Sequence, residues 1–231
     1  MDDSVSCVML CSWPRRAAMV ADACAAYDLQ THANKELVVV NDGEPMRALR
    51  DDVRVYNVPR LTIGEKRNIG AEMAEGGWLA TWDDDDVSFP GRLADSLAIA
   101  RRHDAVAVRG EHMAYTDERM RVLGVVASVC YPTGLVQRDA WLRVGGCPPL
   151  SYAEDMELWA RLMVRRFRTA RHSGMFYAHR RHGANVTLSR EALSTFVARA
   201  LPAWNSTIPA TQAVVDRVLA HAPHVNLVGP A

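Results

Sequence analysis

Short apolar runs and amphipathic segments alternate along the first hundred residues of the chain. Residues 5–10 form a six-residue apolar run with β-branched content, which predicts a buried first strand. Pro14 is well placed near the start of a helix that runs to about Tyr27, and a second apolar strand is predicted at residues 36–40. A strand, a helix and a strand in this length predict a right-handed parallel unit. Asp42 is then expected at the C-terminal edge of the sheet, although its segment taken alone is also typical of an ordinary turn.

The rest of the chain continues this alternation less regularly. Residues 111–130 alternate loosely and indicate a hairpin or irregular strands. The last 40 residues hold two helix-like apolar stripes, which core packing or a dimer contact explains. The predicted fold is α/β, with a mixed, mainly parallel sheet flanked by helices and with C-terminal helices. Further strands are predicted at residues 54–58, 79–82, 105–108 and 133–138, and helices at 62–74, 90–102, 139–144 and 152–162.

Four consecutive carboxylates, Asp83 to Asp86, follow the predicted strand at residues 79–82. Open α/β sheets keep their binding sites at the C-terminal ends of strands, so this placement favours a functional site. Carboxylates packed this closely either raise one another's pKa or hold a cation, and hard oxygen ligands suit Mg²⁺ or Mn²⁺. The alternative is a solvated acidic turn before the helix near Pro90. The buried strand in front of the run favours the site, because a core strand fixes the position of the groups that follow it.

Other charged residues stand at predicted helix starts and strand ends. Lys66 and Arg67 occupy a first helical turn, where cations are unfavourable unless an anion such as a phosphate is present; a solvated surface pair is the alternative. Glu154 and Asp155 open another helix, where acidic groups are favourable simply as caps. A group of His and Arg residues at 179–182 follows an aromatic strand end, and its histidines are either structural or ligands of a cation.

Composition limits the class of protein. The chain has 231 residues with an apolar share of 49%, which suits one domain, or one domain with a helical appendage. No apolar run approaches the roughly 18 residues of a membrane helix, and no signal-peptide pattern opens the chain, so we expect a soluble, cytoplasmic protein. The five cysteines are an odd number without close paired spacing. They are predicted to be small core residues, not a disulfide framework or a zinc site.

Charge is balanced overall but unevenly distributed. Residues 1–160 hold 17 Lys and Arg against 25 Asp and Glu, whereas residues 161–190 hold eight Arg and no acid. Such a basic segment is able to meet phosphate in a nucleotide donor, an acidic acceptor or a nucleic acid. A solvated arginine-rich helix face explains it equally well, because Arg supplies 25 of the 27 basic residues.

The order of these features resembles the family 2 glycosyltransferases, inverting enzymes with the GT-A fold. The resemblance rests on five landmarks that together cover roughly residues 5–185. They are the first strand, the Asn41-Asp42-Gly43 turn after the second strand, the Arg67-Asn68-Ile69-Gly70 helix, the Asp-x-Asp strand end at Trp82 to Pro90, and Glu154-Asp155. Two segments depart from the family pattern: Asn41 stands where Asp is usual, and Cys11-Ser12-Trp13-Pro14 replaces the usual Thr-Tyr-Asn.

The resemblance implies a role for individual residues of this chain. It implies that Asp42 contacts the nucleotide base, that Arg67 lies near the base or diphosphate, and that Asp83 holds the ribose. Asp85 is expected to bind Mn²⁺ or Mg²⁺, and Asp155 to act as general base. His182, in a His-Gly-x-Asn segment, is expected to complete the metal site or touch the diphosphate. Leu10 and Asp84 are also assigned to the nucleotide-sugar site.

The expected protein is therefore a metal-dependent inverting glycosyltransferase that uses a nucleotide-diphosphate sugar. Its GT-A-like domain is expected at residues 1–190, with a nucleotide-binding half at about 1–104, an acceptor-side half at about 105–190, and a helical extension at 191–231. The sequence does not identify the acceptor. The arginine-rich segment favours an anionic acceptor, for which a modified DNA base is one option, and the lack of a membrane helix argues against a lipid-linked one. A homodimer is a further option.

Two other functions compete with this one. A haloacid-dehalogenase-like phosphotransferase fits the Asp83-x-Asp85-x-Val87 pattern, but its nucleophile strand normally lies near the start of the domain, and here two strand and helix units precede it. A non-catalytic module that binds nucleotide sugars or nucleic acid is the second alternative. The presence of Asp83, Asp85 and Asp155 together speaks against it, because a lapsed enzyme has no physical reason to keep them.

Overall fold

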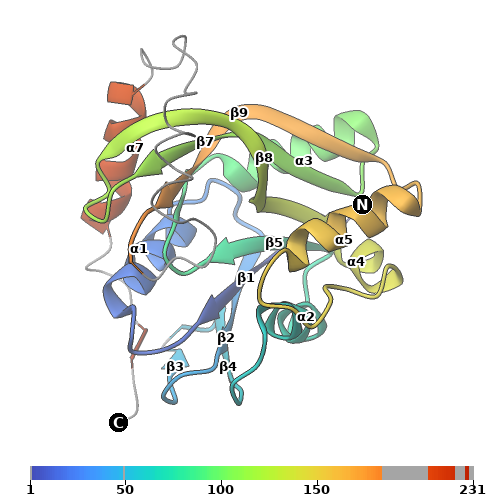
Figure 1. Ribbon diagram of the computed structural model, residues 1–231, viewed down its shortest axis with the longest axis horizontal. Helices are drawn as coiled ribbons and strands as arrows, with labels where there is room; N and C mark the ends of the chain where they lie inside the picture. The colour runs from blue at the N-terminus through green and yellow to red at the C-terminus, as the bar shows by residue number, and fades with distance from the viewer. Residues whose placement is uncertain (1, 49, 184–207, 222–226, 229–231) are drawn as a thin grey trace.

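An eight-stranded sheet runs through the middle of the protein (Figure 1). The computed structural model describes residues 2–48, 50–183, 208–221 and 227–228. One half of the sheet is parallel, in the order β4-β2-β1-β5, and all four strand ends face the same edge. The bounds of these strands are β1 (Val5–Cys11), β2 (Lys35–Asn41), β4 (Val53–Asn57) and β5 (Trp78–Asp83).

The other half of the sheet is built on a long hairpin that arches over the parallel strands in Figure 1. Strand β8 (Val122–Gln137) pairs antiparallel with β5 and with β7 (Ala107–Thr116). Strand β9 (Thr169–Arg180) then lies parallel to β7, and the short β6 (Val87–Ser88) closes the edge beside β9. A separate two-stranded sheet joins β3 (Arg47–Ala48) to β10 (Leu227–Val228).

Helices cover both faces of the sheet, because the apolar side chains of the central strands alternate between two cores. On β1, Cys7 and Met9 enter one core, and Val8 enters the other. The first core receives α1 (Ala17–Asp28), α3 (Arg92–His103) and α7 (Ile208–His221). The second core receives α2 (Ile63–Met73), α4 (Arg138–Arg143) and α5 (Glu154–Val164).

The α/β fold with a mixed, mainly parallel sheet is confirmed, and most differences concern element bounds. The helix expected from Pro14 begins three residues later, at Ala17, after a turn. Residues 111–130 belong to a hairpin, which is one of the two structures predicted for them. The strand predicted at residues 133–138 forms the end of β8. Strand β8 pairs with both β5 and β7, so one sheet runs through both predicted halves of the domain. The division of the domain into two halves near residue 104 stays a prediction.

The structure also tests the predictions about the cysteines, the C-terminal apolar stripes and a membrane helix. Cys7, Cys11, Cys24 and Cys147 are buried and free, as expected of small core residues, while the side chain of Cys130 is outside the described part. Val215 and Val218 of α7 are fully buried, which favours core packing for that stripe. The preceding apolar stripe, residues 193–204, lies outside the described residues. Within the described ranges, no helix combines the length and apolar character needed to cross a bilayer.

Candidate active site

The C-terminal edge of the parallel strands brings the predicted site residues together. The register places Leu10 of β1 opposite Asp83 of β5, and Cys11 opposite Asn41 of β2. The first turns of α2 and α5 and the end of β9 reach the same edge, because their side chains contact the carboxylates there. Residues from these elements therefore form one polar cluster, in which directly bonded partners are up to 97 positions apart in sequence.

Asp42 is held by two neighbours at the end of β2. Lys66 Nζ lies 2.8 Å from Asp42 Oδ2, and the hydroxyl of Ser12 donates to the other carboxylate oxygen. Burial acts to raise the pKa of Asp42, but the hydrogen bonds from Lys66 and Ser12 outweigh it and lower that pKa. The carboxylate is therefore ionised and fixed in place. Lys66, whose position in a first helical turn suggested a phosphate or a solvated pair, is a buried partner of Asp42.

The amide of Asn41 explains the departure from Asp at this position. Its Nδ2 donates to the carbonyl of Glu44 at 2.7 Å and to Asn57 Oδ1 at 2.8 Å, and its Oδ1 accepts from the backbone N–H groups of Trp13 and Gly43. A carboxylate has no proton to donate, so Asp would leave two acceptors facing its negative charge. Asn41 thus anchors the loop after β1 to the end of β2.

Arg67 connects the two predicted halves of the site. Its Nε donates to Glu154 Oε1 at 3.0 Å, and its Nη2 lies 3.4 Å from Asp83 Oδ1. Burial favours the neutral guanidine, but the nearby carboxylates of Asp83 and Glu154 outweigh this and raise the pKa of Arg67. The charged group is thus buried between an acid of β5 and an acid of α5. A solvated surface pair, the alternative from sequence, is wrong for Arg67 as it is for Lys66.

Asp83 and Asp86 share the hydroxyl of Tyr177. The Tyr177 oxygen lies 2.9 Å from Asp83 Oδ2 and also donates to Asp86 Oδ2. One hydroxyl carries one proton, so it donates to only one of two carboxylates. Burial, with the charges of Asp86 and Asp85, raises the pKa of Asp83 to about 6 against the opposing effect of Arg67. A proton on Asp83 at mildly acidic pH therefore completes this chain of hydrogen bonds.

Asp86 joins the acidic run to strand β9. Its Oδ1 accepts from the backbone N–H of Arg180 at 2.7 Å, and its Oδ2 lies 2.9 Å from His179 Nδ1. Burial opposes the imidazolium, but the charge of Asp86 prevails and raises the pKa of His179 to about 9. Asp86 is only 3% exposed, so a solvated acidic turn is the wrong description of this residue. Its contacts give it a structural role.

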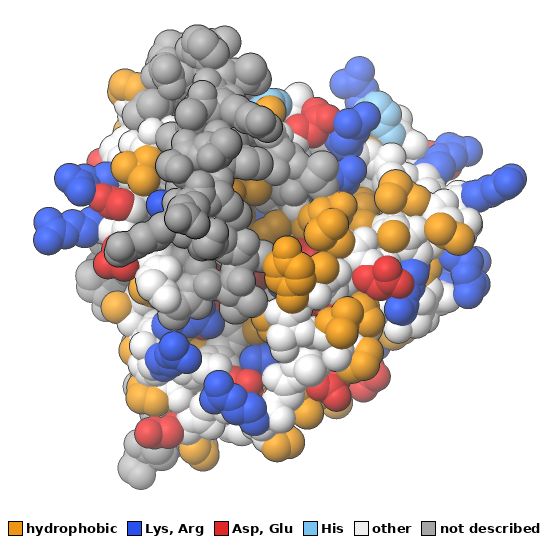
Figure 2. All heavy atoms as spheres, in the orientation of Figure 1, with side chains coloured by type: hydrophobic (Ala, Val, Ile, Leu, Met, Phe, Trp, Pro, Cys, Tyr) orange, Lys and Arg blue, Asp and Glu red, His pale blue; other side chains and the backbone are white. Residues whose placement is uncertain are grey.

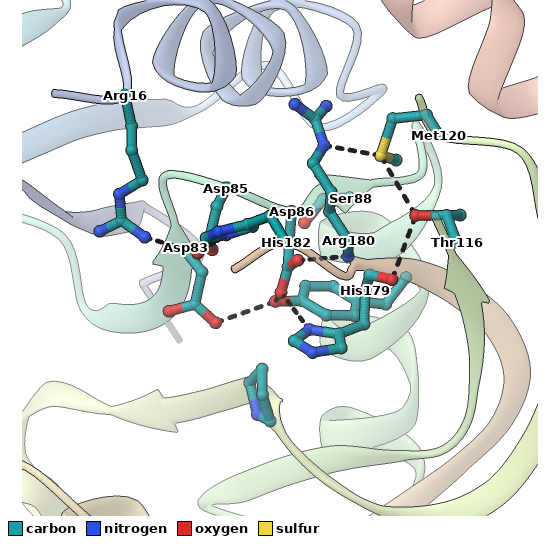
Figure 3. A network of polar contacts seen from close by, with 12 residues as sticks. Arg16, Asp83, Asp85, Asp86, Ser88, Thr116, Met120, His179, Arg180 and His182 are labelled. Atoms are coloured by element: carbon teal, nitrogen blue, oxygen red, sulfur yellow. Dashed lines mark hydrogen bonds and ion pairs between the residues drawn. The ribbon is translucent and has the colours of Figure 1, made fainter. Parts of the chain in front are cut away.

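Asp84 and Asp85 meet Arg16 and His182. Arg16 Nη2 lies 3.0 Å from Asp84 Oδ1, and Arg16 Nη1 lies 2.6 Å from Asp85 Oδ2. His182 Nε2 lies 2.9 Å from the same Asp85 oxygen (Figure 3). Burial acts to raise the pKa of Asp85, but the hydrogen bond with His182 and the charge of Arg16 lower it. Burial instead raises the pKa of Asp84, whose Oδ2 has no hydrogen-bond partner.

The donor set fits a divalent cation that is completed by substrate. Across the described ranges, no group of three or more His, Cys, Asp or Glu side chains is arranged to hold a metal ion. Asp85 Oδ2 and His182 Nε2 are 2.9 Å apart, close to the roughly 3 Å between two neighbouring ligands of a cation bound at about 2.1 Å. Mg²⁺ usually takes one or two protein ligands and fills the remaining positions with water and substrate phosphate. Asp85 and His182 therefore suit such a cation.

Asp155 lies at the first turn of α5, next to Arg67 and Glu154. The helix begins after Ala153, which has a left-handed backbone with φ of 60°, an uncommon conformation for a residue with a Cβ. Asp155 Oδ1 accepts from the backbone N–H of Met156 at 2.7 Å. Burial raises the pKa of Asp155, and the charge of Arg67 only partly offsets this. A half-buried carboxylate with a raised pKa is suited to take a proton.

Three residues of the cluster were missed from sequence. Arg16 is one of 25 arginines, and nothing in its local pattern marks it. Tyr177 belongs to the aromatic strand end that precedes the His and Arg group, so that segment did carry a signal. Asp86 was noticed only as part of the acidic run. Its separate role depends on β9, which follows it by about 90 residues.

Comparison with known proteins places this chain among glycosyltransferases. Residues 13–149, more than half of the chain, match the family model described as glycosyl transferase family 2. A curated relative is EpsE of Bacillus subtilis, to which a glycosyltransferase activity is attributed. It is 26% identical over 166 residues, and the match covers 60% of each protein. The chain thus spans about 60% of the length of this curated relative.

Solved structures of TarS from S. aureus share the fold. The structure of its residues 1–349 in complex with UDP-GlcNAc has a TM-score of 0.63 and 16% sequence identity, over 95% of this chain and 71% of that one. The same segment in complex with UDP gives a TM-score of 0.60 and 18% identity, over 95% and 70% of the two chains. At this identity the likeness concerns the fold.

Proposed function

The chain belongs to glycosyl transferase family 2, and we propose on this basis that it transfers a sugar from a nucleoside diphosphate sugar to an acceptor hydroxyl, with inversion at the sugar carbon. The observation that carries the proposal is the meeting, at one sheet edge, of the Asp85 and His182 pair with the helix that bears Asp155. Arg67 joins the two sides by contacting both Asp83 and Glu154. The family match also argues against a haloacid-dehalogenase-like phosphotransferase.

The nucleotide is proposed to bind along the ends of β1, β2 and β5. Asp42, fixed by Lys66 and Ser12, supplies an ionised acceptor for the donor N–H groups of a base. Asp83 supplies an acceptor for ribose hydroxyls, and Leu10 and Asp84 line the same edge. The complex of TarS with UDP-GlcNAc supports a nucleotide-sugar ligand for this fold, while the base and the sugar of this chain's donor are to be measured.

Asp85 and His182 are proposed to hold Mn²⁺ or Mg²⁺ together with the diphosphate. Bound there, the cation would supply positive charge to stabilise the leaving nucleoside diphosphate. The chain's own contribution is to bring Asp85 Oδ2 and His182 Nε2 together at the end of β5. The two protein ligands leave positions for phosphate oxygens.

Asp155 is proposed as the general base. Inversion requires the acceptor hydroxyl to attack from the face opposite the leaving group and to lose its proton as it attacks. A positioned carboxylate takes that proton, which typically contributes a factor of about 10² to 10⁴ in rate. The raised pKa of Asp155 supports this role, because a more basic carboxylate accepts a proton more readily.

The test is a donor screen. UDP-, GDP- and dTDP-sugars are incubated with the protein, with Mn²⁺, with Mg²⁺ or with EDTA, and the release of nucleoside diphosphate is followed. We expect cation-dependent release from one class of donor, and candidate acceptors added to that reaction should accelerate it. Binding of a nucleotide sugar without turnover under any acceptor would favour the non-catalytic module. Absence of nucleotide binding under every condition would contradict the proposed function.

A further inference from the structure

Arg16 occupies the side of the acidic run where the cation and the diphosphate are proposed to bind. It comes from the turn directly before α1, and Figure 3 shows its guanidinium pointing toward Asp85 and His182. Its two terminal nitrogens contact two different carboxylates, Asp84 at 3.0 Å and Asp85 at 2.6 Å. No other Lys or Arg of the described residues forms an ion pair with either acid.

Arg16 and a divalent cation compete for one oxygen atom. Asp85 Oδ2 accepts from Arg16 Nη1, and it is also the oxygen that faces His182 Nε2. A cation bound to this oxygen at about 2.1 Å would stand next to a guanidinium with a charge of the same sign, and the two repel each other. Binding of Arg16 to Asp85 therefore opposes binding of a metal ion to Asp85, and the reverse also holds.

A metal-bound nucleoside diphosphate offers Arg16 another partner. The planar guanidinium fork binds phosphate oxygens with the same geometry as carboxylate oxygens. The Arg16 side chain is 25% exposed, so it lies at the margin of the site and is not enclosed in the core. The arriving divalent cation would at the same time replace its charge beside Asp84 and Asp85. Asp84 is only 3% exposed and has one oxygen without a partner, which leaves it able to accept a new donor.

We propose that Arg16 is a diphosphate-binding residue that holds Asp84 and Asp85 in the donor-free protein and moves to the diphosphate when the metal-bound donor enters. The inference rests on the proposed function. It adds that metal binding and nucleotide binding are coupled through Arg16: this residue weakens the binding of the metal alone and strengthens the binding of nucleotide in the presence of metal.

The test measures the two affinities in the variant Arg16→Gln. The dissociation constant of Mn²⁺ is measured without nucleotide, by electron paramagnetic resonance of the free ion. The dissociation constant of UDP is measured by calorimetry at saturating Mn²⁺, with GDP or dTDP used if the wild-type protein prefers it. Neighbours of metal ligands typically change metal affinity by 10- to 100-fold. We expect Mn²⁺ alone to bind about tenfold more tightly and the nucleotide about tenfold more weakly.

Two further variants complete the test. Arg15→Gln removes the same charge from the adjacent, exposed residue and should leave both constants unchanged. Arg16→Lys keeps the charge without the planar fork, so intermediate values are expected, and it also serves if Arg16→Gln does not fold. Changes of the same sign in both constants, or no change in either, would overturn the role of Arg16 while leaving the proposed function in place. A wild-type protein that binds neither Mn²⁺ nor any nucleotide would overturn both.

Discussion

At the scale of single residues, the four carboxylates of the acidic run differ because their partners differ. Asp86 is bonded to β9, Asp83 faces the hydroxyl of Tyr177, and Asp85 faces a histidine and an arginine. Burial and neighbouring charge move their pKa values in opposite directions: the pKa of Asp83 rises and that of Asp85 falls. Three of the four identical side chains therefore have different roles: Asp85 is a ligand candidate, Asp83 a proposed nucleotide contact and Asp86 a structural anchor.

The proposed roles of Asp155 and Asp85 predict different defects. Asp155→Asn should lower the transfer rate by a factor of about 10² to 10⁴ with nucleotide affinity nearly unchanged, because only the proton acceptor is lost. Asp85→Asn should instead weaken nucleotide binding in the presence of Mn²⁺, because a charged ligand is lost. Single-turnover kinetics and calorimetry separate the two. Equal losses of donor affinity in both variants would contradict this assignment.

The pair of His179 and Asp86 predicts a pH-dependent stability. The pKa of His179 is raised to about 9 in the folded protein from an ordinary value of 6.5. Its contribution to stability is therefore fully present below about pH 6.5 and is lost as the pH rises through about 9. In metal-free protein, the free energy of unfolding of the wild type should exceed that of His179→Gln by a margin that shrinks over this range. Urea denaturation at pH 6, 7.5 and 9.5 measures it, and a margin independent of pH would contradict the prediction.

At the scale of elements, helix α2 performs three tasks within four residues. Arg67 points to the carboxylates of the site, whereas Asn68 accepts from the backbone N–H of Cys147 and donates to its carbonyl, both at 2.8 Å. Gly70 allows close approach to β1, because a Cβ there would lie 2.2 Å from Val8 Cγ1. The helix thus fixes the site arginine, the segment before α5 and the distance between helix and sheet.

Substitution Gly70→Ala should therefore destabilise the protein. Alanine in a helix gains about 1 kcal/mol over glycine, but overpacking of a buried contact typically costs about 1 to 3 kcal/mol and Val8 is a stiff β-branched neighbour. Because a Cβ 2.2 Å from Val8 Cγ1 forces a group to move, we expect a cost in the upper part of that range and a net loss of about 1 to 2 kcal/mol in the free energy of unfolding by urea. Glu72→Ala, an exposed position of the same helix, is the control and should change stability by less than about 0.5 kcal/mol. A variant at Gly70 as stable as the wild type would show that Val8 gives way.

At the scale of the whole molecule, ion pairs in the fold partly balance the uneven charge seen along the sequence. Arg161 pairs with Glu157, and the remaining pairs join the arginine-rich segment to acids far away in sequence. These pairs are Arg168 with Asp104, Arg171 with Glu111, and Arg180 with Asp22. Figure 2 shows basic side chains spread around the margins of one face and separated by other residues. An anionic acceptor stays a prediction, and these pairs give four of the eight arginines a structural role.

Helix α7 belongs to the main body of the fold, because its side chains join the core that contains α1. Val218 is fully buried there. Truncation in Val218→Ala should lower the free energy of unfolding by about 2 kcal/mol, since it removes buried apolar groups and leaves a cavity. Arg217→Ala, at an exposed position of the same helix, is the matched control. Chemical denaturation measures both, and equal stabilities would indicate that α7 does not contribute to the cooperative unit.

The local pattern of the chain determined the elements and the class of protein. Apolar runs at residues 5–10 and 36–40 are buried on both faces of the sheet, so they signal strands regardless of context. The order of the motifs carried the resemblance to the family, and the family model confirms it. Asp42, Asp83 and Asp85 were placed at one edge because each follows a predicted strand of the parallel sheet, and the structure brings them there.

Tertiary structure alone decided which partners each of these residues has. The contacts of Asp86 with His179, of Arg67 with Glu154 and of Asp85 with Arg16 join residues 69 to 93 positions apart. Local periodicity carries no information about such distant pairs, because they depend on how β5, β9 and the helices pack. For the same reason, the pairing of Lys66 with Asp42 was visible only in the fold.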